Sequence, residues 1–185
     1  MTQPNCFLED IKPYFGDRHI VYVDIGAFHG EVYKSLKSKG IKFKEAHLIE
    51  PNYISYKNLS DEVEGDPFAF VYNVAASSHD IERVQLFQDS NPSMSRVVNT
   101  NHSENLNAPE DCKILSVESK SYDAFSKGIW DEGNDVALLK IDVEGHELEV
   151  IRGASRALDR QNIDVIYIEA GLDPGNTQQT YYRDI

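Results

Sequence analysis

The chain has 185 residues, a length typical of one domain with one hydrophobic core. Its 18 basic and 31 acidic residues give a formal net charge of -13, which argues against nucleic acid or an acidic membrane surface as a partner. Cys6 and Cys112 are too few for a disulfide framework or a zinc knuckle. Residues 1–9 lack the pattern of a secretion signal and no apolar run reaches the length of a membrane span, so we expect a cytoplasmic protein.

Apolar strands alternate with amphipathic helices along most of the chain. In chain order we expect a strand at 20–25, a helix at 31–39, a strand at 46–49, a helix face of Tyr56, Leu59 and Val63, strands at 68–76 and 136–141, a helix face of Leu148, Ile151, Ala154 and Leu158, and a strand at 164–168. Strands that are apolar on both faces and joined by helices are typical of parallel sheets. The pattern therefore predicts an α/β fold with a doubly wound, mostly parallel sheet, in a single domain over residues 1–185.

Residues 81–127 interrupt this alternation. Short apolar runs at 84–87 and 114–118 predict two extra strands. Residues 91–111 between them are rich in Asn, Ser and Pro, which predicts a long loop with a role in function.

A polar turn, DIGAFHG, follows the first predicted strand. Gly26 allows a tight turn that a ligand can approach, and Gly30 allows the next helix to pack closely. The dinucleotide fingerprint G-x-G-x-x-G is not met, because Phe28 and Glu31 occupy its second and third glycine positions. An amino-acid ligand suits the turn better, with its ammonium near Asp24 and its carboxylate near free backbone N–H groups. A plain strand–turn–helix without a ligand remains the alternative.

An acid also ends the second predicted strand. Glu50 lies at a distance along the chain from the first turn that is typical of an acid that binds ribose hydroxyls. Pro51 ends the strand and Asn52 can cap the next helix. The alternative for Glu50 is a surface acid beside a helix cap.

The fourth predicted strand ends in a dense cluster of ionisable residues, LKIDVEGHE. In a doubly wound sheet this end faces the ligand crevice beside the first strand. Burial and neighbouring like charges there can raise the pKa of a carboxyl towards values useful to a general base. Alternatively, Glu144 and Glu147 are acids at the start of a helix, where the helix dipole favours negative charge. The alternative for His146 is an exposed position in the first turn of that helix.

These motifs resemble the FkbM-type methyltransferase family over residues 20–169. The strongest resemblance lies in 138–147 and continues through 154, while the DIGA turn, Gly30 and the Glu50–Asn52 segment match in order and spacing. Residues 72–77 resemble the end of the family's third strand, which lines the adenine, and residues 119–125 resemble the segment before its fourth strand. Phe28 stands where the family commonly has Asn.

The resemblance implies a class I methyltransferase (Rossmann-like) fold with S-adenosylmethionine as the methyl donor. It also implies O-methylation, typically of a sugar or natural-product hydroxyl, and hence a small-molecule acceptor. The class usually adds a helix and two strands after Glu169, so we expect this chain to lack the C-terminal strands. The resemblance and the motifs together give these cofactor-binding candidates: Asp24, Gly26, Ala27, Phe28, Gly30, Glu50, Pro51, Asn52, Ala75, Ala76 and Asp142.

Methyl transfer to a hydroxyl needs the acceptor, the methyl group and sulfur in line, and a group that removes the hydroxyl proton. Asp142 is the first candidate base, followed by Glu144 and His146, and Asp142 could instead orient the cofactor. Asp142 and Glu169 offer two oxygen ligands without an obvious third, so we predict no metal site. A nicotinamide-dependent oxidoreductase and a non-catalytic binding or scaffold domain remain the alternatives.

The apolar strand at 165–168 should form a sheet edge if no strand follows it. It contains no proline or lysine, which often protect such edges from pairing. We expect the 185-residue chain to self-associate, and to bind cofactor better than it turns over an acceptor. Size-exclusion chromatography with light scattering, beside a methyl-transfer assay, checks this. A stable, active monomer would show the prediction to be wrong.

Overall fold

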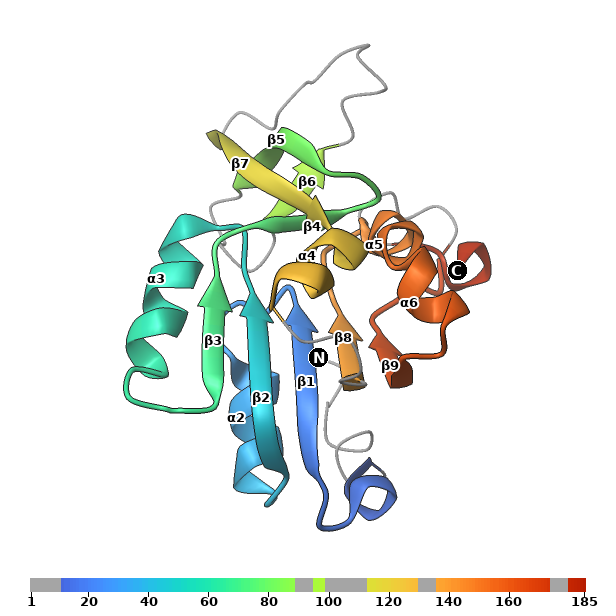
Figure 1. Ribbon diagram of the computed structural model, residues 1–185. Coiled ribbons are helices and arrows are strands. Elements are labelled where there is room, and N and C mark those ends of the chain that lie inside the picture. The colour runs from blue at the N-terminus through green and yellow to red at the C-terminus, as the bar shows by residue number, and fades with distance from the viewer. Residues whose placement is uncertain (1–10, 89–94, 99–112, 130–135, 174–179) are drawn as a thin grey trace.

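Two β-sheets with helices packed around them make up the computed structural model (Figure 1). The structure describes residues 11–88, 95–98, 113–129, 136–173 and 180–185. None of its described helices is long and apolar enough to cross a membrane.

Sheet A has five parallel strands in the order β3-β2-β1-β8-β9. They are β1 (His19–Ile25), β2 (Lys42–Ile49), β3 (Ala69–Tyr72), β8 (Val136–Ile141) and β9 (Ile163–Ile168). The connecting helices are α2 (Glu31–Ser38), α3 (Tyr53–Glu62), α5 (Glu147–Gly153) and α6 (Ser155–Asp159). The chain winds outward from β1 to β3 and then returns to the other side of β1, so the strand order reverses between β1 and β8. This confirms the doubly wound, mostly parallel sheet.

Sheet B has four strands in the order β4-β7-β5-β6 and lies across the carboxyl ends of β1, β2 and β3 (Figure 1). They are β4 (Ala75–Ser77), β5 (Ile81–Gln88), β6 (Arg96–Val98) and β7 (Lys113–Ser121), and α4 (Tyr122–Ile129) follows β7. A short 3-10 helix, η2 (Tyr182–Asp184), lies near the end of the chain. The two extra strands are confirmed and are longer than predicted.

Two sequence predictions differ from the structure in this region. The single strand expected at 68–76 is two strands, β3 in sheet A and β4 in sheet B, because the chain leaves sheet A after Tyr72. Of the predicted loop at 91–111 only residues 95–98 are described, and 96–98 of these form β6. The rest of that loop lies outside the described residues.

Two apolar clusters cover the two faces of sheet A. Successive residues of β1 point to opposite faces, so Tyr22 joins one cluster and Val23 joins the other. The first cluster takes Leu36 of α2 and Leu59 of α3, and the second takes side chains of α4 and α5. This double burial explains why the central strands are almost continuously apolar.

Helix α5 also connects the two sheets. A Cβ atom on Gly153 would lie 2.0 Å from the carbonyl oxygen of Ser77, so only glycine lets α5 approach β4 this closely. The contact fixes the start of sheet B beside the loop that follows β8.

Candidate active site

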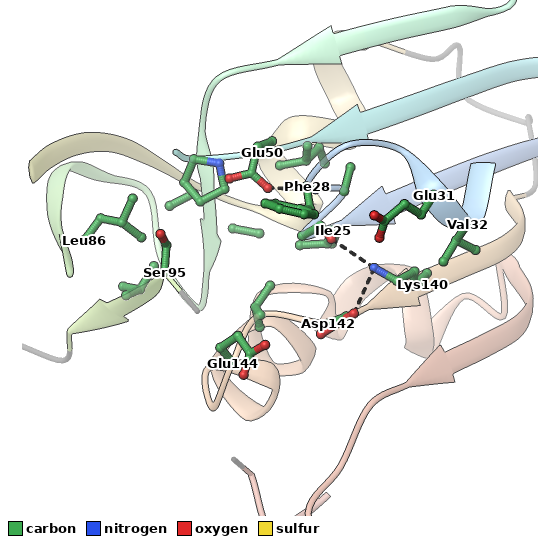
Figure 2. A pocket seen from close by; sticks show the side chains of 18 residues that line it. Ile25, Phe28, Glu31, Val32, Glu50, Leu86, Ser95, Lys140, Asp142 and Glu144 are labelled. Carbon is green, nitrogen blue, oxygen red and sulfur yellow. Dashed lines mark hydrogen bonds and ion pairs between the residues drawn. The ribbon is translucent and has the colours of Figure 1, made fainter. Parts of the chain in front are cut away.

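A cavity of about 170 Å³ opens at the carboxyl ends of β1, β2 and β8 (Figure 2). This is on the order of ten times the volume that one water molecule needs, so a small molecule can enter. The cavity lies where the strand order reverses, which is where open α/β sheets bind ligands. Its lining residues are Ile25, Gly26, Ala27, Phe28, Glu31, Val32, Ile49, Glu50, Pro51, Ala75, Ala76, Leu86, Ser95, Val97, Lys140, Asp142, Val143 and Glu144.

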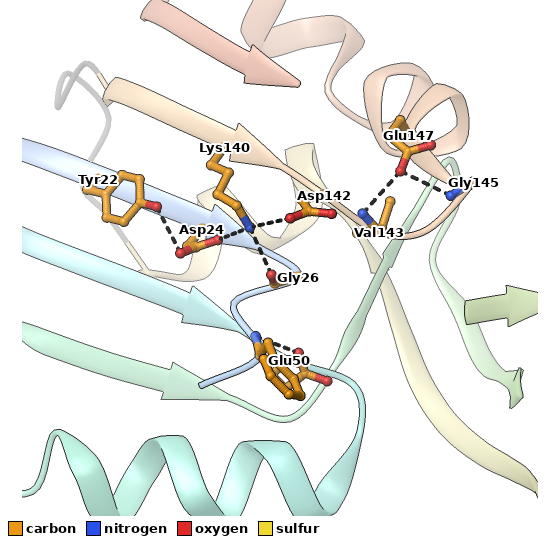
Figure 3. Close-up of polar contacts among 10 residues, drawn as sticks. Tyr22, Asp24, Gly26, Glu50, Lys140, Asp142, Val143, Gly145 and Glu147 are labelled. Carbon is orange, nitrogen blue, oxygen red and sulfur yellow. Dashed lines mark hydrogen bonds and ion pairs between the residues drawn. The ribbon is translucent and has the colours of Figure 1, made fainter. Parts of the chain in front are cut away.

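A buried ammonium group joins β1 to β8 at the base of this cavity (Figure 3). Lys140 Nζ lies 2.9 Å from Asp24 Oδ1, 2.9 Å from the carbonyl oxygen of Gly26 and 3.3 Å from Asp142 Oδ2. The Tyr22 hydroxyl donates to Asp24 Oδ2 at 2.8 Å. Burial by itself lowers the pKa of Lys140, but the charges of Asp24 and Asp142 outweigh burial and raise this pKa. Lys140 is therefore a cation at neutral pH.

This network places Asp24 behind the cavity. Its side chain is 1% exposed, and its two carboxylate oxygens face Lys140 and Tyr22. The position differs from the expected direct contact between Asp24 and a ligand ammonium. Lys140 was not among the predicted site residues, although a lysine inside an otherwise apolar strand, two residues before Asp142, was an available signal.

The glycine turn presses against the end of β8. Gly26 has φ +81°, and a Cβ atom there would lie 1.7 Å from the carbonyl oxygen of Asp142. Phe28 adopts φ +48°, a left-handed conformation that is uncommon for an aromatic residue. The tight turn predicted at Gly26 is present, whereas the close approach there is that of the protein backbone at Asp142 and not that of a ligand.

Most amides of this turn are occupied within the protein. The N–H groups of Gly26 and Ala27 both donate to the carbonyl oxygen of Ile49 at 3.0 Å, and the N–H of Phe28 donates to Glu50 at 2.9 Å. The first turn of α2, which contributes Glu31 and Val32 to the cavity, has no side-chain cap at its N-cap residue, glycine 30. Because the first N–H groups of a helix have no partner within it, the start of α2 offers the backbone donors that the sequence predicted for a ligand carboxylate.

Glu50 bridges two strand ends from a buried position. Its Oε1 atom accepts from the N–H of Asn52 at 2.7 Å, and its Oε2 atom accepts from the N–H of Phe28 at 2.9 Å. Burial raises the pKa of Glu50 to about 7, although these two hydrogen bonds act in the opposite direction. Asn52 caps α3 by accepting from the N–H of Ile54 at 3.0 Å, as its position in the sequence predicted.

The structure brings nine of the predicted site residues together as lining of the cavity: Gly26, Ala27, Phe28, Glu50, Pro51, Ala75, Ala76, Asp142 and Glu144. Asp24, Gly30, Asn52 and His146 lie outside this lining. Gly30 is close to Leu59 of α3, since a Cβ atom there would lie 2.7 Å from Leu59 Cδ1. His146 is buried with Nε2 3.1 Å from Ser77 Oγ, and burial lowers its pKa.

Sheet B contributes a wall that sequence reasoning missed. Leu86 of β5, Val97 of β6 and the neighbouring Ser95 line the cavity. Figure 2 shows Leu86 and Ser95 on the side of the cavity away from Lys140 and Asp142. Ser95 accepts a hydrogen bond from Asn52 Nδ2 at 2.9 Å, which ties this wall to the start of α3. The three residues carry no motif, so only the folded chain reveals them.

Replacing Glu50 by Gln should remove a pH-dependent loss of stability. The folded chain holds this proton up to about pH 7, whereas an unperturbed Glu loses it near pH 4.5. The stability contributed by protonated Glu50 is therefore full below about pH 4.5 and is lost as the pH rises through about 7. The free energy of unfolding, measured with urea, should fall between about pH 5 and about pH 8 by roughly 2–3 kcal/mol more in wild type than in Glu50→Gln. The exposed Glu64→Gln variant is the control, and parallel profiles for wild type and Glu50→Gln would contradict the prediction.

The chain is similar to known methyltransferases. The family model for the methyltransferase FkbM domain matches residues 24–185, from the end of β1 onward. A hexuronic acid methyltransferase, AglP, from Haloferax volcanii is 30% identical over 129 residues, covering 68% of this chain and 48% of that protein. The chain thus spans about half the length of this curated relative.

A solved structure supports the fold. The crystal structure of methyltransferase FkbM from Methylobacillus flagellatus KT superimposes with a TM-score of 0.54 and 21% identity, over 82% of this chain and 33% of that one. The match of the family model over most of the chain shows that the chain belongs to the FkbM methyltransferase family.

Proposed function

We propose that this chain is an S-adenosylmethionine-dependent methyltransferase domain that methylates a hydroxyl group of a sugar or natural product. The observation that carries the proposal is the buried carboxylate of Glu50, which ends β2 and lines a cavity at the point where the strand order reverses. Family membership supports methyl transfer. The relative named as a hexuronic acid methyltransferase supports a sugar as the class of acceptor.

The residues of the cavity fit the parts of this cofactor. Each oxygen of Glu50 accepts one backbone N–H and keeps lone-pair capacity for a ribose hydroxyl. Pro51, Ala75 and Ala76 offer an apolar surface suited to an adenine ring. The first turn of α2 offers free N–H groups and positive potential suited to the carboxylate of the amino-acid part.

When bound, the cofactor supplies a methyl group attached to a positively charged sulfur. The protein must hold the acceptor oxygen in line with that methyl group, and such positioning lowers the activation barrier by several kcal/mol. The protein must also take up the hydroxyl proton. Two of the three candidate bases, Asp142 and Glu144, line the cavity, whereas His146 does not. The wall from sheet B gives the acceptor a neutral surface of Leu86, Ser95 and Val97.

Titration calorimetry with S-adenosylhomocysteine tests the cofactor part of the proposal. Wild type should bind this ligand with no preference for NAD, and Glu50→Ala should lose on the order of 1.5–3 kcal/mol of binding free energy because a charge-assisted pair of hydrogen bonds is removed. Circular dichroism should show that the variant folds, and Glu64→Ala, an exposed substitution, should bind as wild type does. Unchanged affinity in folded Glu50→Ala would remove the ribose role. Tight NAD binding without S-adenosylhomocysteine binding would overturn the proposal.

A further inference from the structure

We infer that Glu144 takes the acceptor proton and that the buried carboxylate of Glu147 positions it for this task. The inference rests on the proposed methyl transfer to a hydroxyl. It assigns separate roles to two acids that lie three residues apart in the cluster that follows β8.

The backbone at Glu144 is held in an uncommon conformation. Glu144 has φ +52° and Gly145 has φ +94°. A left-handed conformation is unfavourable for a residue with a Cβ atom, so the surrounding structure must hold it in place. Residues in such conformations cluster at active sites and ligand-binding loops.

The group that imposes this conformation is the carboxylate of Glu147 (Figure 3). Its Oε1 atom accepts from the N–H of Val143 and from the N–H of Gly145, each at 3.1 Å, and these are the residues before and after Glu144. Its Oε2 atom accepts from the hydroxyl of Thr180. Glu147 is 2% exposed, so its three hydrogen bonds form away from solvent. The carboxylate therefore closes the turn, and Glu144 at its tip lines the cavity (Figure 2).

Glu144 is also the acid of this cluster whose charge is not committed elsewhere. The ammonium of Lys140 lies 3.3 Å from Asp142, which serves as its second counter-charge. His146 lies outside the cavity lining, next to Ser77. Within the described part of the chain, the carboxylate of Glu144 makes no hydrogen bond or ion pair, so it is available to a ligand.

The electrostatic surroundings suit a general base. Burial, followed by the charges of Asp142 and Glu147, raises the pKa of Glu144, while Lys140 acts in the opposite direction. Glu169 at the end of β9 also interacts with Glu144, and burial together with Asp142 raises the pKa of Glu169 to about 7. A carboxyl whose pKa is raised towards neutrality holds a proton more strongly once it has taken it, which is what proton abstraction requires.

The step balances with these groups. A carboxylate oxygen of Glu144 takes the hydroxyl proton as the acceptor oxygen bonds to the methyl carbon. That new bond replaces the carbon–sulfur bond, whose electron pair remains on sulfur and leaves a neutral thioether. Glu144 then releases the proton to solvent and is ready for another turnover.

An NMR titration tests the positioning without any acceptor. Chains labelled with ¹³C-glutamate, with and without S-adenosylhomocysteine, should show a resonance that is absent from Glu144→Gln and that titrates above the ordinary Glu range. In Glu147→Ala this resonance should move towards the ordinary range and the amide of Gly145 should exchange faster. Glu147→Gln keeps an accepting oxygen and should protect Gly145 as wild type does. Ordinary titration of Glu144, or protection of Gly145 that survives Glu147→Ala, would overturn the inference.

Methyl transfer to neutral and acidic hexose glycosides tests the catalytic role. Glu144→Gln should lower kcat by ~10²–10⁴ while its affinity for S-adenosylhomocysteine stays within about threefold of wild type. Glu147→Ala should lower kcat about tenfold or more through lost alignment, and Glu147→Gln should restore most of it. Glu149→Gln is the matched control, because Glu149 bonds Ser78 and Arg152 and does not line the cavity.

The outcomes separate this inference from the proposed function. Wild-type turnover in Glu144→Gln, or loss of turnover in Asp142→Asn alone, would return the role of base to Asp142. If wild type binds S-adenosylhomocysteine but methylates none of the glycosides, the proposed acceptor class fails. In that case the NMR titration still decides whether Glu147 positions Glu144.

Discussion

The ion pair between Lys140 and Asp24 lies between β1 and β8, where the order of the strands in sheet A reverses. The carboxyl ends of two neighbouring strands meet there. A side chain that is 5% exposed fills this position and holds both strands, and it also holds the carbonyl oxygen of Gly26. Removing one partner of a buried pair typically costs about 3–5 kcal/mol, since the other charge is left without compensation. The shape of the glycine turn, and with it the floor of the cavity, depends on this pair.

Two other acids, Glu50 and Glu147, stabilise the loops next to that floor in a similar way. Glu50 accepts backbone N–H groups from two segments, and Glu147 accepts them from both sides of one residue. In each case a buried carboxylate satisfies amides that an irregular loop leaves without partners, and it fixes the loop without a longer stretch of secondary structure. The net charge of -13 thus reflects, in part, acids that serve the backbone of the site as well as its chemistry.

The sequence predicted the central strands well, because strands buried on both faces are continuously apolar. The limits predicted for β8 agree with the structure at both ends, whereas β2 starts at Lys42, four residues before the prediction, since its first half alternates buried and exposed side chains. The division of residues 68–76 between two sheets could not be predicted, as the choice of partner strand is a long-range property. At the site, the acids at the carboxyl ends of β1, β2 and β8 could be predicted because each stands at the end of an apolar strand. The buried role of Asp24 and the connection through Lys140 depend on side-chain geometry that no local pattern encodes.

The two sheets divide the cavity between them. The acids and the glycine turn belong to the ends of sheet A, and the opposite wall of Leu86, Ser95 and Val97 belongs to sheet B and its margin. Leu86 and Val97 have no charge and no polar side-chain group, so exchanging them for other apolar side chains leaves the charged floor intact. Under the proposed function, evolution can therefore change the wall that faces the acceptor by altering sheet B, without rebuilding the strand ends that hold the cofactor.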